Sequence, residues 1–124
     1  MTGDRRRIVV LGDDLIWSER LTRLVAAAGA DPVTARDAAS YRAALADAEG
    51  VIIDLTATRY EPLTAIERAH GAGLRVLAVG QHDDHALRKR ALAAGAERVY
   101  AYRKLFEDGP ATVAGWLAGA ATTA

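Results

Sequence analysis

Short apolar runs alternate with longer segments in which apolar residues recur every three or four positions along the whole chain. The short runs are rich in β-branched residues and nearly free of polar ones, which is typical of strands buried on both faces of a parallel sheet. The longer segments are typical of amphipathic helices, and several of them end in glycine, as helices commonly do. The pattern predicts strands over residues 7–12, 32–35, 51–55, 75–79 and 98–102, and helices over residues 15–28, 38–48, 62–70, 85–94 and from 110 onward.

This regular alternation predicts an α/β fold. A helix that connects two parallel strands crosses over in a right-handed sense, so successive units form a doubly wound sheet with helices on both faces. The chain has 124 residues and no linker or low-complexity segment, so we expect residues 1–124 to form a single domain with a substantial core.

Composition and charge narrow the range of functions. Sixteen basic and sixteen acidic residues cancel, so no overall field attracts nucleic acid, and we expect no nucleic-acid partner. The chain has no cysteine, which excludes disulfides, thiolate zinc sites and thiol nucleophiles. The apolar runs are too short to cross a bilayer and no secretory signal is recognisable, so we expect a cytoplasmic protein without membrane contact. Abundant alanine and scarce lysine indicate a GC-rich bacterial genome.

Acidic residues follow two of the predicted strands. Asp13 and Asp14 come directly after the first apolar run, and Asp54 ends the third. Ligands of open α/β sheets bind at the carboxyl ends of the strands, where these side chains would converge. Neighbouring carboxylates repel one another and favour a divalent cation or a shared proton. The alternative is structural, because Asp13 and Asp14 could cap the first helix and Asp54 could be a polar strand terminus.

A specific resemblance follows from these residues. The order of the units, the acidic pair, Asp54 and the segment Ala93-Ala94-Gly95-Ala96 before the last strand resemble the receiver domain of bacterial response regulators, the CheY-like family. The resemblance extends over nearly the whole chain and implies a flavodoxin-like five-stranded sheet in the order 2-1-3-4-5. It also implies that Asp54 is the phosphoacceptor, and that Mg²⁺ is held by Asp13, Asp54 and the carbonyl of Thr56, with Asp14 as a further candidate ligand.

Three positions depart from the family pattern. Gly12 takes the place of the first acidic residue, and Gly80 takes the place of a hydroxyl residue after the fourth strand. The lysine after the fifth strand has no clean counterpart: a direct count gives Tyr102, one inserted residue gives Arg103, and Lys104 is the third candidate. The departures predict an atypical receiver, or pseudo-receiver, in which Asp54 is phosphorylated weakly or not at all.

The resemblance implies a signalling role without an enzymatic one. We expect a stand-alone protein whose output comes through contact with a signalling protein or histidine kinase, or through a homodimer. Aromatic and basic residues of the kinds that dominate interfaces gather in the fourth helix and around the fifth strand. The predicted contact residues are Arg88, Arg90, Tyr100, Tyr102 and Phe106.

A small metal-dependent enzyme is the alternative from a different class. His82 and His85 lie on the same predicted rim as the acidic residues, and imidazole with carboxylate suits a transition metal. The competing interpretation is a solvated turn in which Asp83 or Asp84 caps the fourth helix. No nucleophile or substrate pocket is identifiable in the sequence, so the enzyme ranks below the signalling module.

Overall fold

A five-stranded parallel sheet forms the centre of the protein. The computed structural model describes residues 6–122, with side chains for residues 6–119. The strands lie in the order β2-β1-β3-β4-β5, and every neighbouring pair is parallel, which confirms the predicted flavodoxin-like sheet. Their bounds are β1 (Arg7–Leu11), β2 (Asp31–Ala35), β3 (Gly50–Asp54), β4 (Arg75–Gly80) and β5 (Arg98–Ala101).

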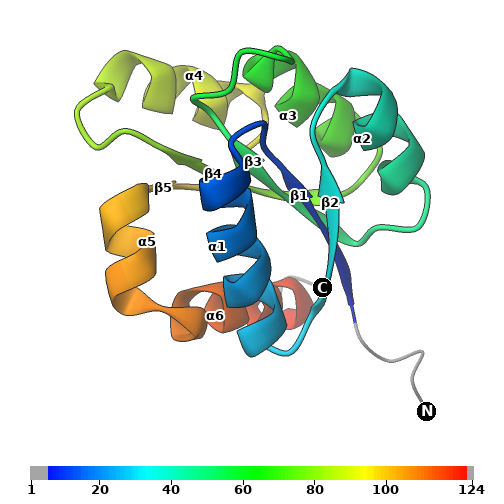
Figure 1. Cartoon of the computed structure of the whole chain (residues 1–124), viewed down its shortest axis with the longest axis vertical. Coiled ribbons are helices and arrows are strands. Elements are labelled where there is room, and N and C mark those ends of the chain that lie inside the picture. Colours follow the sequence, from blue (N-terminus) through cyan, green and yellow to red (C-terminus); the bar gives the residue numbers. More distant parts are fainter. Residues whose placement is uncertain (1–5, 123–124) are drawn as a thin grey trace.

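Helices cover both faces of this sheet, as predicted. Figure 1 shows one layer on each side of the strands. The first layer consists of α2 (Ala38–Leu45), α3 (Pro62–Gly71) and α4 (His85–Ala94). The second consists of α1 (Leu15–Ala27), α5 (Tyr102–Asp108) and α6 (Pro110–Thr122). Within residues 6–122, no helix combines the length and the apolar character needed to cross a membrane.

The central strands are buried on both faces because their side chains alternate between the two layers. Val9 and Leu11 of β1 pack toward α2, α3 and α4, whereas Ile8 and Val10 pack toward α1, α5 and α6. All four are fully buried, and each such side chain stabilises the fold by roughly 1.5–3 kcal/mol. This burial on both sides explains why the strands appear in the sequence as continuous apolar runs.

The end of the chain differs from the prediction. Strand β5 ends at Ala101, and Tyr102 begins a helix, α5, where we expected the strand to continue and then a connection to residue 110. Tyr102 and Leu105 lie three positions apart and are both buried against the sheet, which fixes one face of this helix. Gly109, with φ of 72°, ends it before α6 begins.

Charge pairs on the outer face also stabilise α5. Arg103 bonds Glu107 at 3.1 Å, and Lys104 lies 3.4 Å from Asp108. Both are pairs four residues apart, the spacing that brings side chains together on a helix. A seven-residue helix carries too few apolar positions to show a helical period, so the sequence pattern missed it.

Helix α2 is shorter than predicted. It ends at Leu45, and residues 46–49 turn back toward the start of β1. The N–H of Ala48 donates to the carbonyl of Leu45 at 3.2 Å, and the N–H of Glu49 donates to the carbonyl of Arg7 at 2.9 Å. These bonds replace further helical ones, so the alanine-rich composition extended the predicted helix by three residues.

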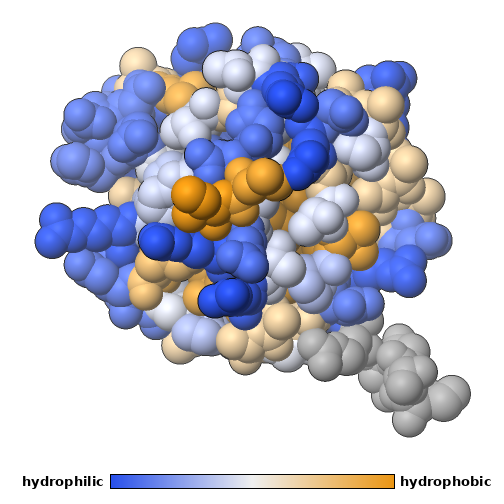
Figure 2. Space-filling model, in the orientation of Figure 1, coloured by the Kyte–Doolittle hydropathy of each residue, from blue (hydrophilic) through white to orange (hydrophobic). Residues whose placement is uncertain are grey.

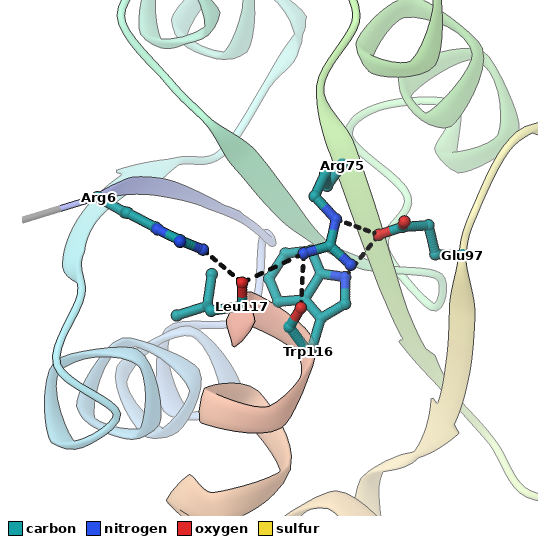
Figure 3. Close-up of polar contacts among 5 residues, drawn as sticks. All are labelled: Arg6, Arg75, Glu97, Trp116 and Leu117. Carbon is teal, nitrogen blue, oxygen red and sulfur yellow. Dashed lines mark hydrogen bonds and ion pairs between the residues drawn. The ribbon is translucent and has the colours of Figure 1, made fainter. Parts of the chain in front are cut away.

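The amino end of the sheet is joined to α6 by a polar cluster. Oε1 of Glu97 accepts hydrogen bonds from Nε of Arg75 and Nε1 of Trp116, both at 2.8 Å. Arg75 also donates to the carbonyl of Trp116, and Arg6 donates to the carbonyl of Leu117. Figure 3 shows these side chains converging on the helix from β4, from the residue before β1 and from the loop before β5. The cluster holds α6 against the edge of the sheet opposite the carboxyl ends of the strands.

An apolar patch lies near the carboxyl ends of the strands. Figure 2 shows it over the first turn of α1, where Leu15 and Ile16 are each 64% exposed. Single exposed apolar residues are ordinary, but two adjacent ones leave a small uncovered apolar surface beside the acidic residues that end β1 and β3.

Candidate functional site

Asp54 is a buried carboxylate at the end of the central strand β3. It is only 1% exposed, because β1 and β4 flank the strand and helices cover both faces. Its Oδ1 atom accepts hydrogen bonds from the backbone N–H of Thr56 at 2.8 Å and from the Thr56 hydroxyl at 2.7 Å. The hydroxyl of Tyr102 donates a third bond to the same oxygen. A buried carboxyl group requires such partners, and here one oxygen receives all three hydrogen bonds.

Tyr102 reaches this carboxylate from the first turn of α5. Its hydroxyl also lies 3.1 Å from Oγ1 of Thr56, so the phenol, the threonine and the carboxylate form a closed polar group. Burial, and then the bond to Asp54, raise the pKa of Tyr102 well above its usual value. The phenol is therefore a neutral hydrogen-bond donor at physiological pH, standing beside a carboxylate.

The ring of Tyr102 is held by aromatic neighbours. It stacks on Trp17 of α1, with ring centroids 4.4 Å apart and an interplanar angle of 29°. Phe106, one turn later in α5, stacks on the same tryptophan at 5.6 Å. Stacked aromatic pairs contribute roughly 0.5–1.5 kcal/mol beyond their buried area. The stack fixes the direction of the phenol and joins α1 to α5.

Asp13 is turned toward the loop between β3 and α3. Its Oδ2 atom accepts hydrogen bonds from the backbone N–H groups of Thr58 at 2.8 Å and Arg59 at 2.9 Å. Desolvation acts to raise the pKa of Asp13, but these two backbone bonds outweigh it and the pKa lies below its ordinary value. The side chain thus anchors the loop as an ionised group.

Asp14 is the N-cap of α1. Its Oδ1 atom accepts hydrogen bonds from the backbone N–H groups of Ile16 at 2.9 Å and Trp17 at 3.1 Å. These are the exposed donors that a cap residue normally satisfies. Asp14 therefore has the helix-capping role that was the alternative to metal binding for the acidic pair.

Gly12 leaves a small space that its neighbours already limit. A Cβ atom at this position would lie 2.9 Å from Oγ of Ser18 and 3.5 Å from Cβ of Asp54. The first distance is shorter than real contacts allow, so an acidic side chain at position 12 would require Ser18 to move. The Ser18 hydroxyl is itself buried and finds no hydrogen-bond partner among the described residues.

Gly80, at the end of β4, is limited in the same way. A Cβ atom there would lie 3.2 Å from Cδ1 and 3.4 Å from Cβ of Leu55. Leu55 follows Asp54 directly and is 5% exposed, so it has little room to withdraw. A hydroxyl side chain at position 80 would crowd this leucine.

Tyr60 is a site residue that the sequence did not indicate. Its hydroxyl lies 2.6 Å from the carbonyl oxygen of Asp54 and 3.0 Å from that of Leu11. The phenol thus joins the last residues of β1 and β3 beneath the carboxylates. The sequence carries no signal for this role, since a tyrosine in a loop has many uses.

Solved structures supply the comparison that decides the fold. No protein-family model matches the sequence, and no curated protein matches it. The BeF3-activated receiver domain of DrrB matches 91% of this chain and 94% of its own, with a TM-score of 0.76 at 12% identity. A CheY-like receiver domain protein from Methanospirillum hungatei JF-1 matches over 85% and 90%, with a TM-score of 0.70 at 19% identity. The chain has the receiver fold.

A third receiver-fold structure carries ligands. The response regulator from Burkholderia pseudomallei, crystallised with a phosphorylated aspartic acid, a calcium ion and citrate, matches over 78% of this chain and 59% of its own, with a TM-score of 0.69 at 20% identity. The likeness of all three lies in the path of the chain, because their sequence identities are low.

Tyr102 is the residue that contacts Asp54. It is also the residue that the direct count along the sequence from the Ala-Gly-Ala segment gave for the position of the family lysine. Arg103 and Lys104, the other candidates, lie on the outer face of α5 in ion pairs with Glu107 and Asp108, and their side chains are 89% and 64% exposed. Neither cation is directed at the carboxylate, because the helix that begins at Tyr102 turns the next two residues toward solvent.

Four of the five predicted contact residues are exposed or half-buried, and one is buried. Arg88 and Arg90 are exposed on α4, and Tyr100 is half-buried on β5. Tyr102 is 8% exposed, and Phe106 is half-buried against Trp17. Tyr102 lies mostly inside the site, where its hydroxyl meets Asp54, so the other four residues are the more exposed candidates for a contact.

Few oxygens remain for the divalent cation that the receiver resemblance implies. Mg²⁺ takes carboxylate and carbonyl oxygens, but one oxygen of Asp13 and one of Asp14 accept from backbone N–H groups, Oδ1 of Asp54 accepts three hydrogen bonds, and position 12 has no side chain. No group of three or more His, Asp or Glu side chains in the described part of the chain could hold a metal ion.

The alternative of a metal-dependent enzyme gains no support from the segment after β4. His82 and His85 are exposed, and Asp84 caps α4 by accepting a hydrogen bond from the N–H of Leu87 at 3.1 Å.

Proposed function

We propose that this chain is an atypical receiver that signals through protein contact, and that Asp54 is not a working phosphoacceptor. The observation that carries the proposal is the hydrogen bond from the Tyr102 hydroxyl to Oδ1 of Asp54. It places a neutral donor where the receiver resemblance calls for a lysine.

The chemistry of phosphoryl transfer explains why this substitution matters. A carboxylate that attacks phosphorus approaches negatively charged oxygens, so cations must neutralise the charge that develops. Here the group next to Asp54 is an uncharged phenol, and the nearby cations Arg103 and Lys104 are paired elsewhere. Attack through Oδ1 of Asp54 would also cost this oxygen its bonds to Thr56 and Tyr102, each worth about 1.5–3 kcal/mol, which leaves Oδ2 as the oxygen that could attack.

A titration followed by amide NMR tests this proposal. Mg²⁺ is added first and beryllofluoride second, to wild type and to Asp54→Asn, since beryllofluoride stands in for a phosphoryl group on an aspartate. We expect no beryllofluoride-dependent shifts in either protein, and no phosphoryl adduct by intact mass after incubation with acetyl phosphate. Shifts near Asp13 and Asp54 that spread to β5 and vanish in Asp54→Asn would instead establish a phosphoreceiver and end the proposal.

Contact through α4 is the second part of the proposed function. Ala91 is buried and holds this helix to the sheet, while Arg88, Arg90 and Leu92 face outward, the last with 43% exposure. A basic surface with one apolar residue is suited to an acidic partner surface. The partner is a signalling protein, such as a histidine kinase, or a second copy of the chain.

Charge reversal tests this surface. The double variant Arg88→Glu/Arg90→Glu is compared with Arg23→Glu/Arg42→Glu, which makes the same charge change on α1 and α2. We expect the α4 variant alone to change the oligomer size measured by light scattering or to lose the partner recovered by cross-linking. Equal behaviour of the two double variants would remove the basis for the α4 surface.

A further inference from the structure

A pocket of about 600 Å³ opens beside the Asp54 site. It lies between α1, α5 and the segment that follows β4, and its principal lining residues are Trp17, Arg20, Gln81, His82, Tyr102 and Phe106. Small-molecule sites commonly occupy roughly 300–1,000 Å³ and lie at the carboxyl ends of the strands in open α/β sheets. The pocket satisfies both conditions.

One wall of this pocket is aromatic. Trp17, Tyr102 and Phe106 form the stack described above, and all three line the cavity. Gly80, which has no side chain, also lines it. An aromatic wall favours a flat apolar body that can pack against the parts of the rings left free by the stack.

Two acidic and two basic side chains line the pocket, and one of the cations, Arg20, favours a negative charge on the ligand. Glu107 is paired with Arg103, and Asp14 accepts two backbone bonds from α1, so both acidic groups already have partners. The guanidinium carbon of Arg20 lies 5.2 Å from the centroid of the Trp17 ring, and Arg20 has no ion-pair partner among the side chains of residues 6–119. Its guanidinium is therefore the charge available to a ligand that rests on the aromatic wall.

Two further donors stand on the rim. The side chains of Gln81 and His82 are exposed, line the pocket, and make no hydrogen bond to another described residue. Each of these two side chains can donate a hydrogen bond, and each also carries an acceptor. A carboxylate or phosphate accepts hydrogen bonds only, so it would use their N–H groups together with Arg20.

We propose that this pocket binds a planar aromatic molecule that carries one anionic group. The inference goes beyond the proposed function, because it assigns an input signal to a receiver fold, and it does not depend on whether Asp54 can be phosphorylated. A ligand in this pocket would contact Trp17 of α1 and Phe106 of α5. It would also contact Tyr102, and could thereby shift the hydrogen bond from Tyr102 to Asp54.

The test uses naphthalene-2-carboxylate as the probe and naphthalene-2-carboxamide as its neutral match. The chain has two tryptophans, and Trp116 is buried in the cluster at the opposite edge of the sheet. In an amide NMR titration we expect the indole N–H signal of Trp17 to shift with the carboxylate while that of Trp116 stays in place. The carboxamide should bind about tenfold more weakly, because it lacks the charge that Arg20 would meet.

Variants separate the charge from the aromatic wall. Arg20→Gln should weaken the carboxylate about tenfold and leave the carboxamide unchanged. Arg23→Gln is the matched control, since its side chain lies on the same helix, is 78% exposed and is not part of the pocket lining. Phe106→Ala should weaken both probes, because both stack on the same wall.

Three results would overturn the inference. Absence of any Trp17 shift at the solubility limit of the carboxylate would show that the pocket does not take such molecules. Equal shifts of both indole signals would indicate non-specific binding. Equal affinities of Arg20→Gln and Arg23→Gln would remove the assigned role of Arg20. None of these results depends on the beryllofluoride titration, so the two proposals can fail separately.

Discussion

The hydroxyl of Tyr102 donates a hydrogen bond to Oδ1 of Asp54, although the two residues are 48 positions apart in the sequence. This contact joins the last residue of β3 to the first residue of α5. The ring of Tyr102 also stacks on Trp17, so the first residue of α5 is held both to β3 and to α1.

Removing the hydroxyl should destabilise the protein. Tyr102→Phe keeps the ring on Trp17 but takes one donor from a buried carboxylate, so we expect the free energy of unfolding to fall by about 1.5–3 kcal/mol. Urea denaturation measures this loss. Tyr100→Phe is the control, because its hydroxyl makes only a 3.4 Å contact with exposed Arg98, and it should cost less than about 0.5 kcal/mol. Equal losses in the two variants would contradict the role given to the bond.

Buried tyrosines should make the protein sensitive to alkali. Burial raises the pKa of Tyr41, Tyr60 and Tyr102 in the folded state, whereas in the unfolded chain a tyrosine ionises near pH 10. The folded protein then holds protons that the unfolded chain has lost. The free energy of unfolding should therefore be unaffected by these groups below about pH 10, and should fall above it by about 1.4 kcal/mol per pH unit for each tyrosine.

Urea denaturation at several pH values on either side of pH 10 measures this slope. Tyr41→Phe removes one of the three groups and should reduce the slope by about a third. Absorbance of phenolate in the folded protein gives an independent check, since the buried groups should ionise only when the protein unfolds. A slope near zero above pH 10 would show that these tyrosines ionise in the folded state.

Gly12 and Ser18 should be coupled. Gly12→Ala places a Cβ atom 2.9 Å from Oγ of Ser18, and overpacking of this kind commonly costs about 1–3 kcal/mol. Ser18→Ala removes a buried hydroxyl without a partner in the described structure, so by itself it should be neutral or stabilising. In the double variant the clash disappears, and the cost of Gly12→Ala should fall by more than half. Additive costs in this cycle would mean that Ser18 is not the obstacle at position 12.

The polar cluster at α6 should contribute measurably to stability. Glu97→Ala removes the acceptor shared by Arg75 and Trp116, and we expect a loss of about 1–3 kcal/mol. Glu19→Ala is the control, because its one ion pair, with Arg23, is exposed and should be worth less than about 0.5 kcal/mol. Thermal or urea denaturation compares the two. A loss from Glu97→Ala no larger than that of the control would leave the cluster without a stabilising role.

The sheet could be predicted from sequence because its strands are buried on both faces. Val9, Val10, Ile52 and Ile53 stand in continuous apolar runs typical of buried strands, and the order of the strands came from the resemblance to receiver domains. Helix α5 could not be predicted, because its buried face consists of only a few residues and its ion pairs are visible only once a helix is assumed.

The sequence predicted where Asp54 lies but not most of the contacts that its side chain and its neighbours make. Asp54 could be placed at the end of its strand, since a charge that ends an apolar run is unusual. The partner of each carboxylate could not be foreseen, because it depends on side-chain directions that local sequence does not determine. Asp13 and Asp14 are adjacent in sequence, yet one bonds a distant loop and the other caps its own helix.

The crowding around Gly12 and Gly80 has an evolutionary consequence. In each case the space that a longer side chain would need is occupied by a neighbour, Ser18 in the first and Leu55 in the second. A larger residue at either position would therefore displace that neighbour, so such a change is easier when the neighbour changes with it. Replacing Tyr102 by lysine would in addition remove the aromatic stack. The present arrangement is thus difficult to leave one substitution at a time, and a lineage that acquired it would tend to keep it.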